Sequence, residues 1–245
     1  MFQLFTTFLF QPLLNALVFL YNIIPGHDIG LAIIGLTIVI KIILYPFSLQ
    51  SLKSQKALQD LQPKIEEIKK NHKDDKEKQA RAMMELYKKE KVNPLSSCLP
   101  LLIQLPFLIA VYQVFQTGLS SASLNLLYPF ISNPGHLNPV SFGLIDLSKP
   151  NVVLAVLTGL AQYFQSKMLV TKRPPKKIPG AKDEDMMTIM NQQMLYFMPV
   201  FTVIICISLP SGLVVYWLVM TILTILQQLW MFKDKNKTNQ VVEVK

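Results

Sequence analysis

The chain has 245 residues, of which 51% are hydrophobic and 16% charged, and its mean hydropathy is +0.35. The length would suit one or two soluble domains, but the apolar residues gather into stretches of about 20, the length that crosses the hydrocarbon core of a bilayer. The net charge of +9 does not indicate nucleic-acid binding, because the basic residues are confined to a few segments. This composition predicts an integral membrane protein.

Residues 1–28 are apolar and lack the basic start of a signal peptide. Polar residues recur at every fourth position within them and form one narrow stripe on a helix: Gln3, Thr7, Gln11 and Asn15. We expect a helix that lies in the extracytoplasmic interface, because no Lys or Arg would hold the N-terminus in the cytoplasm. Alternatively, this helix could cross the membrane as a sixth span with the N-terminus in the cytoplasm. The orientation of the five later helices would be the same, so the charge distribution leaves this alternative open.

Five transmembrane helices are predicted from the apolar stretches that follow. The last stretch, from Tyr196 to Phe232, is too long for one crossing and contains the helix-breaking run Leu209-Pro210-Ser211-Gly212, so we divide it into two helices. The predicted helices cover residues 29–50, 95–117, 151–170, 196–209 and 212–232. The expected fold class is an all-α membrane protein with a five-helix core.

The basic residues indicate how these helices are oriented. Of the 24 Lys and Arg residues, twelve lie between Lys53 and Lys91, five between Lys172 and Lys182, and four after Phe232. The loop 118–150 holds only Lys149, and residues 1–28 hold none. Because positive charge marks the cytoplasmic side of short loops, the segments 51–94, 171–195 and 233–245 are predicted to be cytoplasmic. The C-terminus then lies in the cytoplasm.

The segment 51–94 is charged, free of Gly and helical in period. Two apolar stripes lie on either side of a polar turn at residues 71–75: Leu58, Leu61, Ile65 and Ile68 before it, and Met83, Leu86 and Tyr87 after it. They predict two antiparallel helices that project into the cytoplasm as a hairpin, with Pro63 kinking or restarting the first. The hairpin is either a solvated connector or a mobile docking surface for a substrate or a ribosome.

One charge falls far from the ends of a predicted membrane helix. Lys41 lies near the middle of helix 29–50, where a Lys costs roughly 2.5 to 3.5 kcal/mol on insertion scales. No Asp or Glu occurs within any of the five predicted helices, so no ion pair can be drawn inside the membrane. We therefore predict a water-filled polar groove around Lys41.

Polar side chains that could line this groove occur on several predicted helices. Thr37 lies one helical turn before Lys41 on the same face. The other candidates are Gln104, Gln162, Gln165, Tyr216 and Trp217. Each Gln alone could equally form an interhelical hydrogen bond, and Tyr216 and Trp217 could belong to the packing or to an aromatic belt. An unpaired cation in a groove would ease the entry of an acidic segment into the bilayer, or it would serve anion transport; the residues leave both open.

The sequence holds no pattern that indicates catalysis. It has no P-loop and no nucleophile–base constellation, and its three histidines lie in three separate loops: His27, His72 and His136. Cys98 and Cys206 both fall in or beside apolar helices, so a disulfide framework is not expected. We predict neither enzymatic activity nor a cofactor or metal.

Several motifs resemble the YidC/Oxa family of membrane insertases. The most specific is Lys91-Val92-Asn93-Pro94-Leu95-Ser96-Ser97-Cys98-Leu99-Pro100, followed by Gln104-Leu105-Pro106, which resembles the entry to a family transmembrane helix. Further similar segments follow the family order: Lys41-Ile42-Ile43-Leu44-Tyr45-Pro46, Gln62-Pro63-Lys64, Lys73-Asp74-Asp75-Lys76, Asp146-Leu147-Ser148-Lys149-Pro150, Met198-Pro199, and Leu209-Pro210-Ser211-Gly212-Leu213-Val214-Val215-Tyr216-Trp217. The likeness extends over residues 29–232.

This resemblance implies a five-helix core with a hydrophilic groove open to cytoplasm and lipid. It places the family's groove cation at Lys41, its neighbouring Thr at Thr37 and its substrate-facing aromatic residue at Trp217. The family usually has Arg and often Tyr where this chain has Lys41 and Trp217; Lys keeps the charge but lacks the planar five-donor fork of Arg. The sequence looks like the short form of a bacterial YidC, without the large periplasmic domain.

The resemblance also implies partners and location. The expected partners are nascent membrane proteins and the lipid bilayer, with the ribosome and a Sec translocon as further candidates and no nucleic-acid specificity. The expected location is the bacterial plasma membrane. A small channel or transporter with an intramembrane anion site is the alternative function, and an assembly scaffold beside a Sec translocon is a third.

Overall fold

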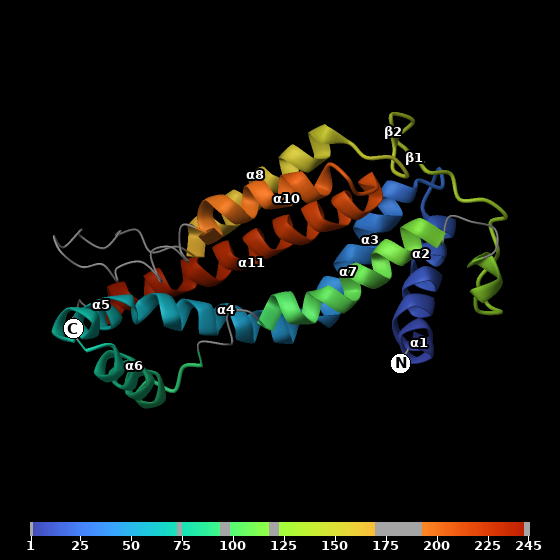
Figure 1. Ribbon diagram of the computed structural model, residues 1–245. Coiled ribbons are helices and arrows are strands. Elements are labelled where there is room, and N and C mark those ends of the chain that lie inside the picture. The colour runs from blue at the N-terminus through green and yellow to red at the C-terminus, as the bar shows by residue number, and fades with distance from the viewer. Residues whose placement is uncertain (1, 73–74, 94–98, 118–122, 170–192, 243–245) are drawn as a thin grey trace.

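The computed structural model describes residues 2–72, 75–93, 99–117, 123–169 and 193–242 (Figure 1). The chain is mostly helical, as predicted. Among the described residues, three helices are long and apolar enough to cross a membrane: Gln3–Ile23, Val152–Leu169 and Ser211–Met231. A fourth crossing results if the bent pair Ile29–Ile43 and Tyr45–Asp60 is one span. The apolar helices Leu102–Gln116 and Gln193–Cys206 are shorter, so by this measure the described residues give fewer than five clear crossings.

The N-terminal helix consists of α1 (Phe2–Phe5), a π-helical turn η1 (Thr6–Phe10) and α2 (Gln11–Ile23). Part of its polar stripe faces protein rather than water. The Asn15 side chain is 2% exposed; its Nδ2 donates to the Leu126 carbonyl at 3.1 Å and its Oδ1 accepts from the Tyr128 N–H at 2.6 Å. Gln11 Nε2 donates to the same Leu126 carbonyl at 3.0 Å. The stripe therefore ties the helix to the loop after α7, whereas its interfacial placement stays a prediction.

The predicted helix 29–50 is not straight. The structure divides it into α3 (Ile29–Ile43) and α4 (Tyr45–Asp60), which meet at a bend of 67°. Pro46 lies in the first turn of α4, where its missing N–H is tolerated but where its ring disfavours a continuous helix from α3. This bend places Lys41 in the last turn of α3, next to the change of direction, and not at the centre of a continuous helix.

Pro63 acts in the same way at the end of α4. Helix α5 (Gln62–Asn71) restarts with Pro63 in its first turn and packs against α6 (Lys76–Lys89). The Asp75 carboxylate caps α6 by accepting from the Lys78 N–H at 3.0 Å. A salt bridge of 2.5 Å between Lys64 and Glu90 joins the two arms. In Figure 1 this helical hairpin lies at the opposite end of the molecule from the strands.

The remaining elements form the rest of the bundle. They are α7 (Leu99–Thr117), the 3₁₀ turn η3 (Ser123–Leu126), α8 (Val152–Leu169), the π-helical turn η4 (Gln193–Phe197), α10 (Met198–Cys206) and α11 (Ser211–Val242). Two short antiparallel strands, β1 (Val140–Ser141) and β2 (Ile145–Asp146), form a β-hairpin in the loop before α8, which the sequence analysis did not predict. Most of the predicted loop 171–195 lies outside the described residues.

The main apolar core joins α2, α3, α7 and α11 near the β-hairpin end of the bundle. Its fully buried members include Leu14, Leu17, Ile33 and Leu36. On the other side of α11, α8 packs against both α10 and α11 (Figure 1). Many large apolar side chains on the outside of these helices are exposed, as expected for surfaces that face lipid.

A glycine allows the close packing of α8 on α10. A Cβ atom at Gly159 would overlap the Val203 side chain and lie 3.1 Å from the Pro199 carbonyl oxygen. Small residues permit this approach because membrane helices associate through close packing and interhelical hydrogen bonds.

We expect Gly159→Ala to lower the free energy of unfolding by about 1 to 3 kcal/mol, because overpacking outweighs the better helix propensity of Ala. Unfolding of the purified protein can be followed through the reaction of the buried Cys206 thiol with a maleimide dye in a Cys98→Ser background. Leu160→Ala, at a neighbouring position that is 50% exposed, serves as the control. Equal stability of Gly159→Ala and the parent would contradict this account of the α8–α10 contact.

Candidate functional site

Lys41 reaches from the end of α3 to the neighbouring helices. Its Nζ donates to Thr224 Oγ1 of α11 at 2.8 Å and to Ser48 Oγ of α4 at 3.3 Å. Ser48 Oγ donates in turn to Gln227 Oε1 at 2.8 Å. Among the described residues no carboxylate lies within ion-pair distance of Lys41. The Lys41 amine is thus held by two neutral hydroxyls and not by a carboxylate of the described residues.

The bend between α3 and α4 creates this arrangement. Ser48 follows Lys41 by seven residues, so two turns of a straight helix would separate their side chains along the axis. The turn at Leu44 brings the start of α4 back toward Lys41. On α11 the residues Tyr216, Met220, Thr224 and Gln227 share one face at helical spacing, which aligns Thr224 and Gln227 with the same site.

Buried amides continue the polar site toward the helical hairpin. Gln227 is 8% exposed and its Nε2 has no hydrogen-bond partner, and Gln228 is fully buried with neither of its amide atoms paired. Buried polar atoms are nearly always hydrogen-bonded in proteins to protein or to water. The unpaired Nε2 of Gln227, which is linked to Lys41 through Ser48, therefore marks a region that favours water or a polar guest.

The structure separates the residues that the sequence analysis grouped around Lys41. Thr37 is fully buried and its hydroxyl donates to the Ile33 carbonyl of its own helix at 2.7 Å. Gln104 Nε2 donates to the hydroxyl of Tyr216, which is 1% exposed, so these two form a pair inside the bundle. Gln162 and Gln165 are half-buried on α8, and no contact links either of them to Lys41 in the described structure.

Trp217 lies on a different face of α11 from Tyr216. It packs against the small cluster of Ala155, Val214 and Cys206 on the α8 and α10 side. Adjacent helical positions point about 100° apart, so neighbours in sequence reach different sides of the bundle. Tyr216 shares its face with Thr224 and Gln227, which the sequence analysis missed together with Ser48. The spacing of Tyr216, Met220 and Thr224, two steps of four residues, was the signal that could have identified Thr224.

Comparison with known proteins identifies the family. The family model described as 60Kd inner membrane protein matches residues 19–239. A protein of Fusobacterium nucleatum subsp. nucleatum named membrane protein insertase YidC is 33% identical over 229 residues, which cover 93% of this chain and 98% of that relative. The chain belongs to the YidC insertase family. The resemblance seen in the sequence motifs is thereby confirmed.

Other YidC relatives are longer than this chain. The relative from Magnetococcus marinus is 37% identical over 228 residues, and the relative from Geobacter metallireducens is 34% identical over 226 residues. The matched region covers 92% and 91% of this chain but only 36% and 37% of those two proteins. The likeness to them is therefore a likeness to about one third of their length. The YidC family and the apolar helices together establish a multi-pass protein of the bacterial inner membrane.

The Gln104–Tyr216 hydrogen bond offers a test of how the bundle interior is held together. We expect a double-mutant cycle of Gln104→Leu and Tyr216→Phe to give a coupling free energy between about 0.6 kcal/mol, the average measured for hydrogen bonds between membrane helices, and about 1.7 kcal/mol, the maximum. The measurement is denaturant unfolding of the purified single and double variants. The exposed Gln116 donates to Tyr112 within α7, and the cycle on that pair should give a coupling near zero. Equal coupling for the two pairs would contradict the assigned role.

Proposed function

We propose that this chain is a membrane protein insertase, which lets nascent transmembrane segments enter the bilayer without catalysis and without a cofactor. Two observations support the proposal. The relatives carry the name membrane protein insertase YidC. The half-buried ammonium of Lys41, held by hydroxyls and not by a carboxylate, is available to a negatively charged guest.

The proposed topology has five crossings with the C-terminus in the cytoplasm. The two shorter apolar stretches, Leu102–Gln116 in α7 and Gln193–Cys206 in η4 and α10, are proposed to complete the five crossings, and residues outside the described ranges directly precede both α7 and η4. The basic segments 51–94, 171–195 and 233–245 then share the cytoplasmic side, as the distribution of positive charge favours. The N-terminal helix is placed in the extracytoplasmic interface, where it binds the loop before α8 through Asn15 and Gln11.

The proposed groove begins at the cytoplasmic side and reaches Lys41. A Lys ammonium has three donors, of which two bind Thr224 and Ser48. The third can bind a substrate carboxylate without breaking an ion pair. At an effective dielectric constant of about 20, two opposite charges 4 Å apart attract by about 4 kcal/mol. That value offsets the roughly 2.5 to 3.5 kcal/mol that one Asp costs at the centre of a membrane helix.

Insertion then proceeds by the substrate's own preference for lipid. The groove shelters a polar flank, while the apolar segment moves sideways into the bilayer and gains about 25 cal/mol for each Å² removed from water. The membrane potential adds about 2.3 kcal/mol per acidic residue moved outward at 100 mV. The protein lowers the barrier and supplies no energy.

An anion channel is the rival function. The packing of α3 between Lys41 and the β-hairpin end favours the insertase. Ile33, Leu36 and Ile40 are at most 2% exposed and join the apolar core toward the β-hairpin end. A channel would need a polar path through this region.

Anion flux through liposomes that contain the purified protein should therefore equal the flux through empty liposomes, and sustained flux would favour the channel.

The helical hairpin of α5 and α6 is proposed to receive the nascent chain. Charged side chains are frequent on both helices, as suits a hairpin exposed to the cytoplasm. The two helices pack on each other and are joined by the Lys64–Glu90 salt bridge. The ribosome and a Sec translocon are the proposed partners on this side, and depletion of the translocon tests whether insertion is independent of it.

Neutralising Lys41 tests the mechanism. We expect Lys41→Ala to slow insertion of substrates with acidic translocated flanks by about tenfold, corresponding to about 1.4 kcal/mol, and to leave substrates with neutral flanks near the parent rate. Lys41→Arg should retain activity, because the charge remains. The measurement is protease protection of radiolabelled substrates inserted into proteoliposomes.

Lys53→Ala is the matched control, because it removes the same charge from an exposed position on α4. Thermal unfolding of each variant separates a loss of function from a loss of the fold. Equal rates for Lys41→Ala and the parent on acidic-flank substrates would exclude Lys41 from the mechanism.

A further inference from the structure

The β-hairpin before α8 has an apolar tip that no part of the described protein covers. Phe142 is 66% exposed and Leu144 is 85% exposed, with Gly143 between them. A hollow of about 380 Å³ separates the tip from the turn between α2 and α3; it is lined by Phe142 and Gly143 on one side and by Pro25, Gly26 and His27 on the other. The two large apolar side chains thus stand clear of the bundle.

The turn itself is built in an unusual way. The Leu144 N–H donates to the Ser141 carbonyl at 3.0 Å, and both central residues have positive φ, 52° at Phe142 and 68° at Gly143. This is the type I′ pattern, which normally has Asn-Gly or Asp-Gly. A bulky residue at positive φ is a rare outlier. The strained position carries an exposed Phe, although Asn would suit the turn better.

The base of the hairpin is fixed to α3. The Asp28 carboxylate caps α3 by accepting from the Leu31 N–H at 2.9 Å, and it also accepts from the Ser141 hydroxyl at 2.8 Å and the Phe142 N–H at 2.5 Å. Burial alone would raise the pKa of Asp28, but these hydrogen bonds lower it below its usual value of 3.8. Gly30 allows the contact, because a Cβ there would overlap Ser141.

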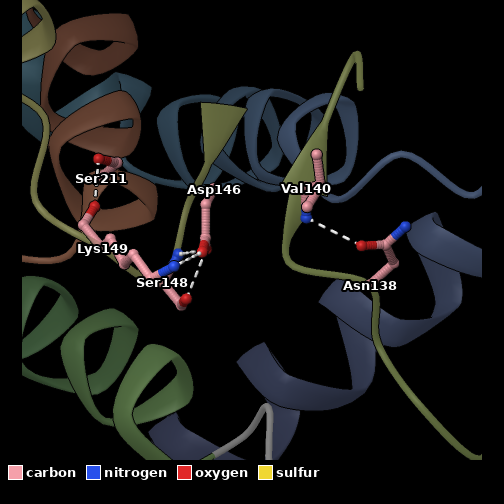
Figure 2. Close-up of polar contacts among 6 residues, drawn as sticks. All are labelled: Asn138, Val140, Asp146, Ser148, Lys149 and Ser211. Carbon is pink, nitrogen blue, oxygen red and sulfur yellow. Dashed lines mark hydrogen bonds and ion pairs between the residues drawn. The ribbon is translucent and has the colours of Figure 1, made fainter. Parts of the chain in front are cut away.

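The base is also fixed to α11 (Figure 2). The Lys149 carbonyl accepts from the Ser211 N–H at 3.0 Å and from the Ser211 hydroxyl at 2.5 Å, and the Gly212 N–H donates to the Leu147 carbonyl at 2.9 Å. Asp146 binds Ser148 and forms a 2.9 Å ion pair with Lys149. The hydrogen bonds of Ser148 and Lys149 lower the pKa of Asp146 to about 2, so it stays ionised.

These contacts place the hairpin at the membrane surface. Its base lies at the first residues of α8 and α11, two of the helices long and apolar enough to cross a bilayer, and of α3, the first half of the bent pair that could form a further crossing; such helices begin where the hydrocarbon begins. Three residues of extended chain from Pro139 to the tip span about 10 Å. Interfacial anchors bury their apolar side by about 5 to 10 Å. The polar base and the apolar tip of the hairpin match the change from polar to apolar surroundings across the membrane interface.

We propose that Phe142 and Leu144 insert into the lipid leaflet at this end of the bundle and anchor the hairpin there. Lipid is the chosen occupant because the hairpin base lies at the first residues of helices that could cross the bilayer and because both exposed tip side chains are large and apolar. The inference stands independently of insertase activity.

A fluorophore at the tip tests the proposal. NBD is attached to Leu144→Cys in a background of Cys98→Ser and Cys206→Ala, and the full chain is reconstituted into vesicles of phosphatidylcholine and phosphatidylglycerol. We expect quenching by lipids spin-labelled near the headgroup and at least a twofold lower quenching constant for aqueous iodide than at Asn133→Cys. Asn133 is an exposed polar position in the same loop.

Two results would overturn the anchor. One is iodide quenching at position 144 equal to that at position 133. The other is shielding from both iodide and spin-labelled lipid, which would indicate a protein contact. Phe142→Asn supplies a second variant that keeps the turn, since Asn-Gly favours it. It should reduce lipid quenching of the position-144 label, and unchanged quenching would overturn the role of Phe142.

Discussion

The cost of one charge inside an apolar bundle governs the proposed site. An unpaired Lys within a membrane region is expensive, and proteins normally offset the cost with a carboxylate or with water. Here the offset comes from Thr224 and Ser48, both neutral. A carboxylate partner would hold the ammonium more firmly but would cancel its charge. Two hydroxyls satisfy donors without adding a negative charge, as the proposed role of Lys41 toward an acidic guest requires.

This choice explains why the chain bends at Leu44. Without the bend, Ser48 would lie two helical turns from Lys41 along a straight axis, and the ammonium would depend on Thr224 alone. Pro46 supplies the bend at little cost, because it lies in the first turn of α4, where no N–H is needed. A backbone feature that looks like a local irregularity thus completes the polar shell around the charge.

The sequence allowed the helices and the unusual charge to be predicted, but not most of the contacts. Lys41 stands out because it is a lone cation among apolar residues. Thr224 and Ser48 do not, since isolated hydroxyl residues are common in membrane helices and their role depends on the bend and on the rotation of α11. Trp217 and Tyr216 illustrate the same limit, because these adjacent residues of α11 pack against different helices. The β-hairpin has strands of two residues, too short for a periodic pattern to appear.

The two ends of the bundle differ in how completely their polar groups are satisfied. At the β-hairpin end, Asp28, Asn15 and the Lys149 carbonyl each accept or donate several hydrogen bonds between distant parts of the chain. At the other end, the buried Nε2 of Gln227 remains unpaired near Lys41, and both amide atoms of the next residue, Gln228, are unpaired as well. A fully satisfied network resists rearrangement, whereas unpaired buried groups gain free energy from any polar partner that enters. The difference is consistent with the proposed insertase, because a polar guest that bound these amides would gain hydrogen bonds without disturbing the network at the β-hairpin end.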